Sequence, residues 1–119
     1  MRSARSLLQP PPRLAAGLFV ALLALVLWGS LGPYAGPGGG RFDKLQHFGA
    51  HAALTLLGFA ILRRRSWRVL LTLVLLGVGI EGLQALPVVG RQASWLDVAA
   101  NLAGALSAWA ARWLTERRR

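Results

Sequence analysis

Four apolar stretches alternate with short polar segments along the 119 residues of the chain. They cover residues 14–31, 45–62, 69–86 and 98–114. Each has roughly the 17 to 20 residues that a helix needs to cross a hydrocarbon layer of about 30 Å. The pattern therefore predicts an all-α fold, a polytopic membrane protein built as a bundle of four transmembrane helices.

The segments between these stretches carry turn chemistry. Gly32-Pro33 and the glycine-rich run 36–40 interrupt the chain after the first stretch. Pro87 is expected to end the third helix near Leu86, because the residue before a proline avoids the helical region. Ser94-x-x-Asp97 has the pattern of a capping box ahead of the fourth helix. The connections are thus short, as expected for helices that follow one another up and down.

Composition favours a membrane protein of one domain. Hydrophobic residues make up 55% of the chain and charged residues 15%, whereas a soluble domain has about 25% charged residues. The absence of cysteine excludes a disulfide frame and a thiolate site. The first stretch follows a basic segment, as in a signal peptide, but it is long and no small-x-small site follows closely. We therefore expect an uncleaved anchor.

The charged residues divide between the two predicted membrane faces. The tails 1–13 and 115–119, the segment 63–68 and Arg112 carry eleven arginines and one glutamate, a net charge of +10. The other face balances three cations with three carboxylates: Arg41, Lys44, Arg91, Asp43, Glu81 and Asp97. The positive-inside rule makes the arginine-rich face cytoplasmic, with both termini inside. Arginines at helix ends that meet anionic lipid account for the net charge, so no nucleic-acid partner is expected.

Polar residues of three predicted helices lie at a similar shallow depth below the neutral face. They are Asp43, Lys44 and His47, then Glu81 and Gln84, then Asp97 and Asn101, with Arg91 in a loop. At about 1.5 Å of rise per residue, His47 and Asn101 each lie about 6 Å below a carboxylate on the same helix face. Ionisable groups within a membrane cost roughly 2.5–3.5 kcal/mol and usually face a cavity or the bundle interior. The sequence therefore predicts one outward-facing polar pocket.

Structural roles remain open for most of these residues. Asp43 and Asp97 would be helix caps, and Lys44 and Arg41 would be interface anchors. Interhelical hydrogen bonds would account for His51, Asn101 and Gln84. Close helix contact would account for Gly49, Gly58, Gly77, Gly79, Gly82 and Gly104. Glu81 is the hardest to explain in this way, because a carboxylate inside a helix needs a cation or a proton. Arg91, Lys44 and His47 are its available partners.

Three short signatures resemble those of a known family. They are Asp43-Lys44-x-x-His47-Phe48, then Glu81-x-x-Gln84 followed by Gly90-Arg91, then Asp97-Val98-x-x-Asn101-x-x-Gly104. Their order and spacing resemble the VanZ family over about residues 42–104. The chain departs from the family pattern at His51, where an aromatic residue is expected, and it lacks the extra segments of longer members. The resemblance implies a bacterial inner-membrane protein of the cell envelope, since the namesake is associated with resistance to the glycopeptide teicoplanin.

Together with these residues, the resemblance implies a pocket that binds or acts on a cell-envelope lipid, a lipid-linked precursor or a glycopeptide-type antibiotic. Glu81 or His47 would act as a base, and Arg91 would hold an anionic group such as phosphate. The further ligand contacts would be Asp43, Lys44, Gln84, Asp97 and Asn101. The alternative is a non-enzymatic protein whose polar cluster only locks the helix bundle.

Metal binding is a third possibility, through Asp43, His47, His51 and Glu81. No zinc motif such as H-E-x-x-H is present, so we expect neither a metal nor another cofactor. The ligand, the oligomeric state and whether any bond is made or broken do not follow from the sequence.

Overall fold

The computed structural model of the protein describes residues 10–32 and 41–118, and the side chains of residues 41 and 42 are not described. The described part of the chain forms four helices and no strand: α2 (Pro12–Leu31), α3 (Arg41–Ile61), α4 (Ser66–Gln84) and α5 (Trp95–Arg117). This confirms the all-α prediction. The predicted glycine-rich break at 36–40 and most of the predicted N-terminal tail, residues 1–9, lie outside the described residues.

The helices begin earlier than the apolar stretches that predicted them. Each starts two to four residues before its stretch, because the first helical turns at Pro12, Arg41, Ser66 and Trp95 include polar residues. The third helix ends at Gln84, two residues before the expected end at Leu86. Ala85 retains helical dihedral angles, and the Leu86 N–H bonds back to the Leu83 carbonyl, so a tight turn replaces the last helical residues.

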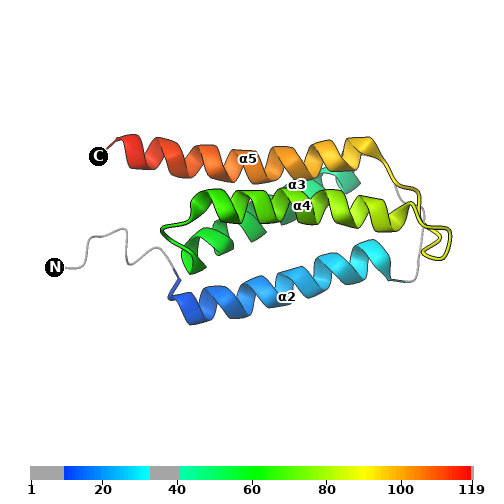
Figure 1. The fold of residues 1–119 in the computed structure, drawn as a ribbon, viewed down its shortest axis with the longest axis horizontal. Helices are drawn as coiled ribbons and strands as arrows, with labels where there is room; N and C mark the ends of the chain where they lie inside the picture. The colour runs from blue at the N-terminus through cyan, green and yellow to red at the C-terminus, as the bar shows by residue number, and fades with distance from the viewer. Residues whose placement is uncertain (1–9, 33–40, 119) are drawn as a thin grey trace.

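The four helices run up and down along the long axis of the molecule (Figure 1). The α3–α4 turn, the start of α2 and the end of α5 lie together at one end (Figure 1). We call this the arginine end; its described arginines are Arg13, Arg63, Arg64, Arg65, Arg68, Arg112, Arg117 and Arg118. The opposite end, which we call the polar end, holds the end of α2, the start of α3 and the α4–α5 connection. The charge partition expected from the sequence is therefore a partition between two ends of the bundle.

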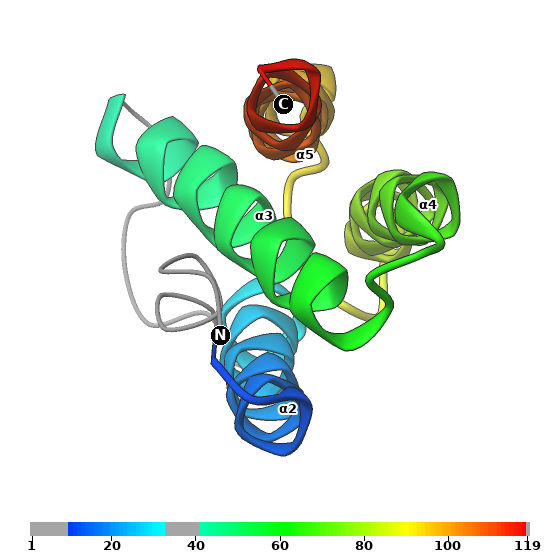
Figure 2. The ribbon, with the colours of Figure 1, turned by 90° about the vertical axis from the view of Figure 1, so that its left-hand side faces the viewer.

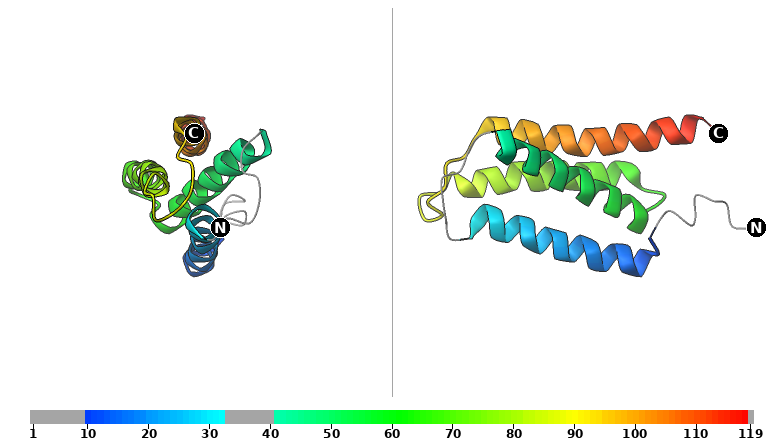
Figure 3. Two further views of the ribbon diagram at one scale, coloured as in Figure 1. Left: turned by 90° about the vertical axis from the view of Figure 1, so that its right-hand side faces the viewer. Right: turned by 180° about the vertical axis from the view of Figure 1, so that it is seen from behind.

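Helix α3 lies at the centre of the arrangement. Viewed along the bundle it crosses obliquely, with α2 on one side and α4 and α5 on the other (Figure 2). Its main packing partner is α5, followed by α2. The view from behind shows the same oblique path of α3 across the other helices (Figure 3). The first turn of α3 therefore meets the first turn of α5 at the polar end.

The close approach of α3 and α5 depends on a glycine. A Cβ atom at Gly104 would collide with the backbone carbonyl oxygen of Phe48. Cβ atoms at Gly58 and Gly77 would lie 2.6 Å from Val69 Cγ1 and 3.0 Å from Asn101 Cβ. These three glycines thus permit the predicted close contacts. The same prediction is wrong for the other three, since a Cβ there meets nothing within 4 Å: Gly49, Gly79 and Gly82.

The distribution of polar and apolar residues is inverted relative to a water-soluble protein. The apolar core is small and consists of Leu54, Phe59, Val69, Leu73, Ala105 and Ala108. Among the residues that the structure describes, seven buried ones are polar or charged: Ser30, His51, Thr55, Glu81, Gln84, Asp97 and Asn101. Large apolar side chains face outward instead, with Trp28 at 70% and Leu25 at 68% exposure. A soluble monomer rarely exposes so large an apolar surface.

Two of the described helices, α2 and α4, are long and apolar enough to cross a membrane. On length and composition alone, this finding associates the chain with a membrane. Helices α3 and α5 are less apolar, because they carry polar residues that face the bundle interior, such as His51, Thr55 and Asn101.

Candidate functional site

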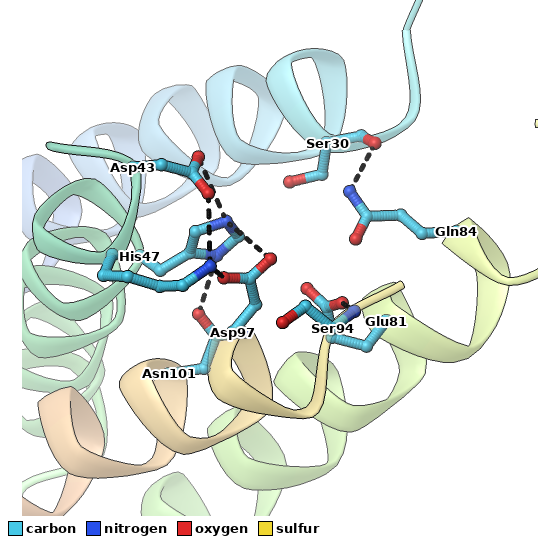
Figure 4. Close-up of polar contacts among 9 residues, drawn as sticks. Ser30, Asp43, His47, Glu81, Gln84, Ser94, Asp97 and Asn101 are labelled. Atoms are coloured by element: carbon cyan, nitrogen blue, oxygen red, sulfur yellow. Dashed lines mark hydrogen bonds and ion pairs between the residues drawn. The ribbon is translucent and has the colours of Figure 1, made fainter. Parts of the chain in front are cut away.

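The polar end brings side chains from α3, α4 and α5 together around one cluster (Figure 4). Lys44 on α3 donates a hydrogen bond to Asp97 Oδ1 on α5, and its Nζ atom lies 3.6 Å from Asp43 Oδ2. The predicted helix face shared by Asp43 and His47 is confirmed, since His47 Nε2 lies 3.7 Å from Asp43 Oδ1. The same nitrogen lies 3.8 Å from Asp97 Oδ2. The predicted convergence of the first and third signatures is therefore present.

Lys44 and Asp97 hold α3 and α5 together by charge. Lys44 precedes the predicted span 45–62, and the hydrogen bond to Asp97 raises the pKa of its ammonium above the ordinary lysine value. Burial opposes this shift. Lys44 therefore carries a positive charge at neutral pH, and the expected role as a simple interface anchor gives way to an ion pair between helices.

Asp97 is not the helix cap that the sequence suggested. Ser94 occupies the N-cap position of α5 as predicted, but its side chain makes no capping hydrogen bond. Its backbone N–H, which a capping box would direct to Asp97, donates instead to Glu81 Oε2 of α4 at 3.1 Å. A carboxylate from a neighbouring helix thus replaces half of the box, and the Asp97 side chain is released to face Lys44 and His47.

Glu81 is 4% exposed and lies behind this contact. Its Oε1 atom has no hydrogen-bond partner among the described residues, while the backbone amide of Ser94 serves Oε2. The hydrogen bond at Oε2 thus comes from a neutral donor. Lys44 and His47 still interact with the carboxylate electrostatically. This hydrogen bond forms because Glu81 of α4 lies beside the start of α5, where the first backbone amides have no partner within their own helix.

Gln84 and Arg91 reach across to the end of α2. Gln84 Nε2 donates to the Ser30 carbonyl at 2.8 Å, and Arg91 donates to the Gly32 carbonyl at 2.9 Å. Terminal helix carbonyls lack partners within their own helix and carry partial negative charge, so they suit an amide and a guanidinium. Gly90 has φ of +65°, a conformation that glycine adopts without strain, and it turns the loop immediately before Arg91.

Sequence reasoning missed the part that α2 plays in the site. Its apolar stretch was expected only to anchor the chain, yet Ser30 and Gly32 supply acceptors to the polar end. One signal was present: Ser30 is a polar residue in the last turn of an otherwise apolar stretch, directly before the Gly32-Pro33 break.

The two remaining predicted residues have contrasting environments. Asn101 contacts His47, with its Oδ1 atom 3.0 Å from His47 Nδ1. His51 is 1% exposed, and neither ring nitrogen has a hydrogen-bond partner among the described residues. The expected interhelical hydrogen bond of His51 is therefore wrong, and its backbone carbonyl accepts from Thr55 instead.

A cavity of about 660 Å³ opens beside the cluster. Its lining includes six of the eight predicted site residues: Asp43, Lys44, His47, Gln84, Arg91 and Asp97. A second cavity of about 310 Å³ shares Gly29, Ser30, Asp43 and His47 with the first and continues along α2 and α3 past Leu25 and Val26. The polar cavity thus adjoins a groove with partly apolar walls.

One subset of the cluster has the composition of a metal site. Asp43, His47 and Asp97 each offer a ligand atom, and these atoms lie within 4.8 Å of one another. Asp97 replaces the His51 and Glu81 that the sequence suggested for such a site.

Comparison of the chain with protein-family models, curated proteins and solved structures gave no match. The functional conclusions below therefore depend on the site itself.

Proposed function

We propose that the chain is a VanZ-like bacterial inner-membrane protein that crosses the membrane four times, with both termini in the cytoplasm. Two observations support four crossings: all four helices run along one axis, and their outward side chains are largely apolar while buried ones are polar. The eight described arginines at one end support the orientation through the positive-inside rule. The polar end then lies in the outer leaflet and faces away from the cytoplasm.

We propose further that the polar end binds an amphiphilic molecule of the cell envelope, a lipid or a lipid-linked precursor. The observation that carries this proposal is the pair of adjoining cavities. The larger one offers charged and hydrogen-bonding groups for a polar head. The smaller one runs from the same residues between α2 and α3 past apolar side chains, where a hydrocarbon chain fits.

The residues of the larger cavity suggest how a head group is held. Lys44 and Arg91 supply positive charge for phosphate or carboxylate oxygens. Of the two bases expected from the sequence, His47 lines the cavity, whereas Glu81 is buried behind Ser94 and Asp97 of the lining. They would act as bases if the bound molecule is also transformed. A glycopeptide antibiotic would meet the same groups with its polar face.

The contacts of Gln84 and Arg91 favour the non-enzymatic alternative for these two residues. Gln84 and Arg91 hold the carbonyl end of α2 against α4 and the following loop. These contacts lock the bundle whether or not a ligand binds. Gln84 and Arg91 therefore have a structural role alongside the proposed ligand contacts, whereas Glu81 and His47 distinguish the two functions.

Complementation of a strain that lacks the gene tests the proposed function. The strain would receive the wild type, Glu81→Gln, His47→Ala or the control Glu116→Gln, which changes an exposed carboxylate at the arginine end. Envelope lipids, lipid-linked precursors and teicoplanin susceptibility would be measured, with protein levels checked by immunoblot. We expect Glu81→Gln and His47→Ala to accumulate normally but to show the phenotype of the deletion. The control Glu116→Gln should show the phenotype of the wild type. Full restoration by Glu81→Gln and His47→Ala would favour the structural alternative.

A further inference from the structure

Three potential metal ligands at the polar end point toward one position. Lys44 interacts with Asp43 Oδ2 and Asp97 Oδ1. The other two carboxylate oxygens, Asp43 Oδ1 and Asp97 Oδ2, lie 3.7 and 3.8 Å from His47 Nε2. These separations exceed a hydrogen bond. They suit atoms that share an ion, because two ligands at about 2.1 Å from zinc lie about 3.4 Å apart at a tetrahedral angle and at most about 4.2 Å apart.

Asn101 orients the histidine for such a role. Its amide oxygen lies 3.0 Å from His47 Nδ1 and can only accept, so this contact favours the tautomer with the hydrogen on Nδ1. In the neutral ring Nε2 then presents its lone pair to two carboxylate oxygens, which also carry lone pairs. A cation between the three atoms would accept all three lone pairs and remove the repulsion between them. An orienting hydrogen bond on the far nitrogen is also what metal-bound histidines usually have.

Three carboxylates gather at the polar end, where Lys44 and Arg91 are the cations that line the cavity. Asp43, Asp97 and Glu81 bring three carboxylates to this end of the bundle, and Lys44 is the described lysine that contacts the two aspartates. Glu81 is 4% exposed, its Oε1 atom has no partner among the described residues, and its carboxylate extends toward the Asp97 side of the cluster (Figure 4). It interacts electrostatically with Asp97, His47 and Lys44. A buried carboxylate oxygen without a partner is strongly unfavourable, so a cation bound beside Asp97 would also stabilise Glu81.

We propose that Asp43, His47 and Asp97 bind a divalent cation of the zinc class. One imidazole nitrogen and two carboxylate oxygens suit zinc, cobalt or manganese better than the oxygen-seeking calcium or magnesium. Three protein ligands leave a coordination position open. That position adjoins the cavity of about 660 Å³, where a phosphate or carboxylate oxygen can complete the coordination. The site goes beyond the proposed function and does not depend on it; with an ion bound, His47 is a ligand and does not act as a base.

Binding of Zn²⁺ and Co²⁺ to the purified full-length protein in detergent tests the proposal. The protein would carry an affinity tag without histidine and would be freed of metal by a chelator. Calorimetry gives the stoichiometry and affinity, and the visible absorption of Co²⁺ reports nitrogen and oxygen ligands. We expect one ion per chain. A wild type that binds neither ion would overturn the proposal.

Matched variants locate the site. Asp97→Asn and His47→Gln should each weaken binding by at least about tenfold, and Asn101→Ala by about 10- to 100-fold as the loss of an orienting residue. Lys44→Met should tighten binding, because a competing positive charge beside both aspartates is removed. Glu116→Gln, at the arginine end, should bind like the wild type. Unchanged affinity in Asp97→Asn and His47→Gln, or weaker binding in Lys44→Met, would contradict this assignment.

Discussion

The two ends of the bundle use charged residues in opposite ways. At the arginine end the charges have mostly one sign and lie at the surface, where Arg112 pairs with the 55%-exposed Glu116 and Arg117 stacks 3.8 Å above the Trp113 ring. At the polar end both signs occur, Asp97 and Glu81 are buried, and the groups contact one another across helices. Exposed charges of one sign suit orientation in a membrane, whereas buried charges of both signs define a site.

The difference also appears in how each end is held together. Arginine side chains at the arginine end donate to backbone carbonyls, as Arg112 does to Phe59 at 3.5 Å, and contact aromatic rings. Such contacts tolerate substitution because solvent or lipid head groups can replace them. At the polar end each partner is specific, so loss of one group leaves another buried without a partner. The predictions below therefore place large effects at the polar end and small ones at the arginine end.

The largest expected effect follows from Gly104→Ala. The new methyl group meets the backbone of Phe48, which cannot rotate away, so α3 and α5 must separate next to His47 and Asn101. We expect a loss of about 3 kcal/mol, at the upper end of the cost of overpacking. Thermal unfolding in detergent measures it. Gly79→Ala is the matched control, since its methyl group meets nothing within 4 Å, and it should stabilise α4 slightly. Equal stability of the two variants would contradict the packing of α3 on α5.

Asp97→Ala should have the next largest effect. It removes the partner of Lys44 and a neighbour of His47, and we expect a loss of about 2 kcal/mol, less than for a fully buried pair because Lys44 is partly exposed. Glu116→Ala breaks an exposed pair at the other end and should cost about 0.5 kcal/mol or less. Parallel denaturation curves of both variants check the contrast. A larger loss for Glu116→Ala would reverse the comparison of the two ends.

Glu81→Gln separates function from stability. The amide oxygen of glutamine can still accept from the Ser94 N–H, so we expect a change in stability of about 1 kcal/mol or less. The charge is lost, and with it the phenotype in complementation. Glu81→Leu removes the acceptor as well and should lower stability by about 1–3 kcal/mol. If Glu81→Gln destabilises the protein as much as Glu81→Leu, the charge itself is structural.

Replacement of Arg63, Arg64 and Arg65 by serine should have the smallest effect on folding. These residues lie in and beside the α3–α4 turn at the arginine end and are exposed, so we expect a change within about 0.5 kcal/mol. Orientation should respond instead, because the net charge of the proposed cytoplasmic face falls. A topology reporter fused after Arg119 would show a mixed population of orientations, in contrast to the uniform cytoplasmic signal of the wild type. Loss of folding without any change in orientation would contradict the proposed role.

The sequence predicted the helices and the residues that gather at the polar end, but few of their partners. Asp43 and His47 share a face because helical spacing fixes it, and Asp97 and Asn101 follow the same rule. Spacing within one helix says nothing about competition between helices. Glu81 therefore accepts a hydrogen bond from the Ser94 amide, which the sequence did not predict, and Asp97 pairs with Lys44 and does not cap α5.

Two further features were not predicted, for the same physical reason. The acceptors of Gln84 and Arg91 are backbone carbonyls at the end of α2, and carbonyls leave no mark in the sequence. His51 was expected to find an interhelical partner, yet its ring lies beside Gly77, which has no side chain to offer.

Cysteine labelling in intact cells tests the central claim, an outward-facing polar end, most directly. The chain has no cysteine, so a single substitution reports one position without background. Gln92→Cys places a thiol in the exposed α4–α5 connection, and Arg64→Cys places one in the α3–α4 turn. We predict that a membrane-impermeant maleimide labels Gln92→Cys in intact cells and Arg64→Cys only after lysis. Labelling of Arg64→Cys but not of Gln92→Cys in intact cells would contradict the orientation and the outward-facing pocket with it.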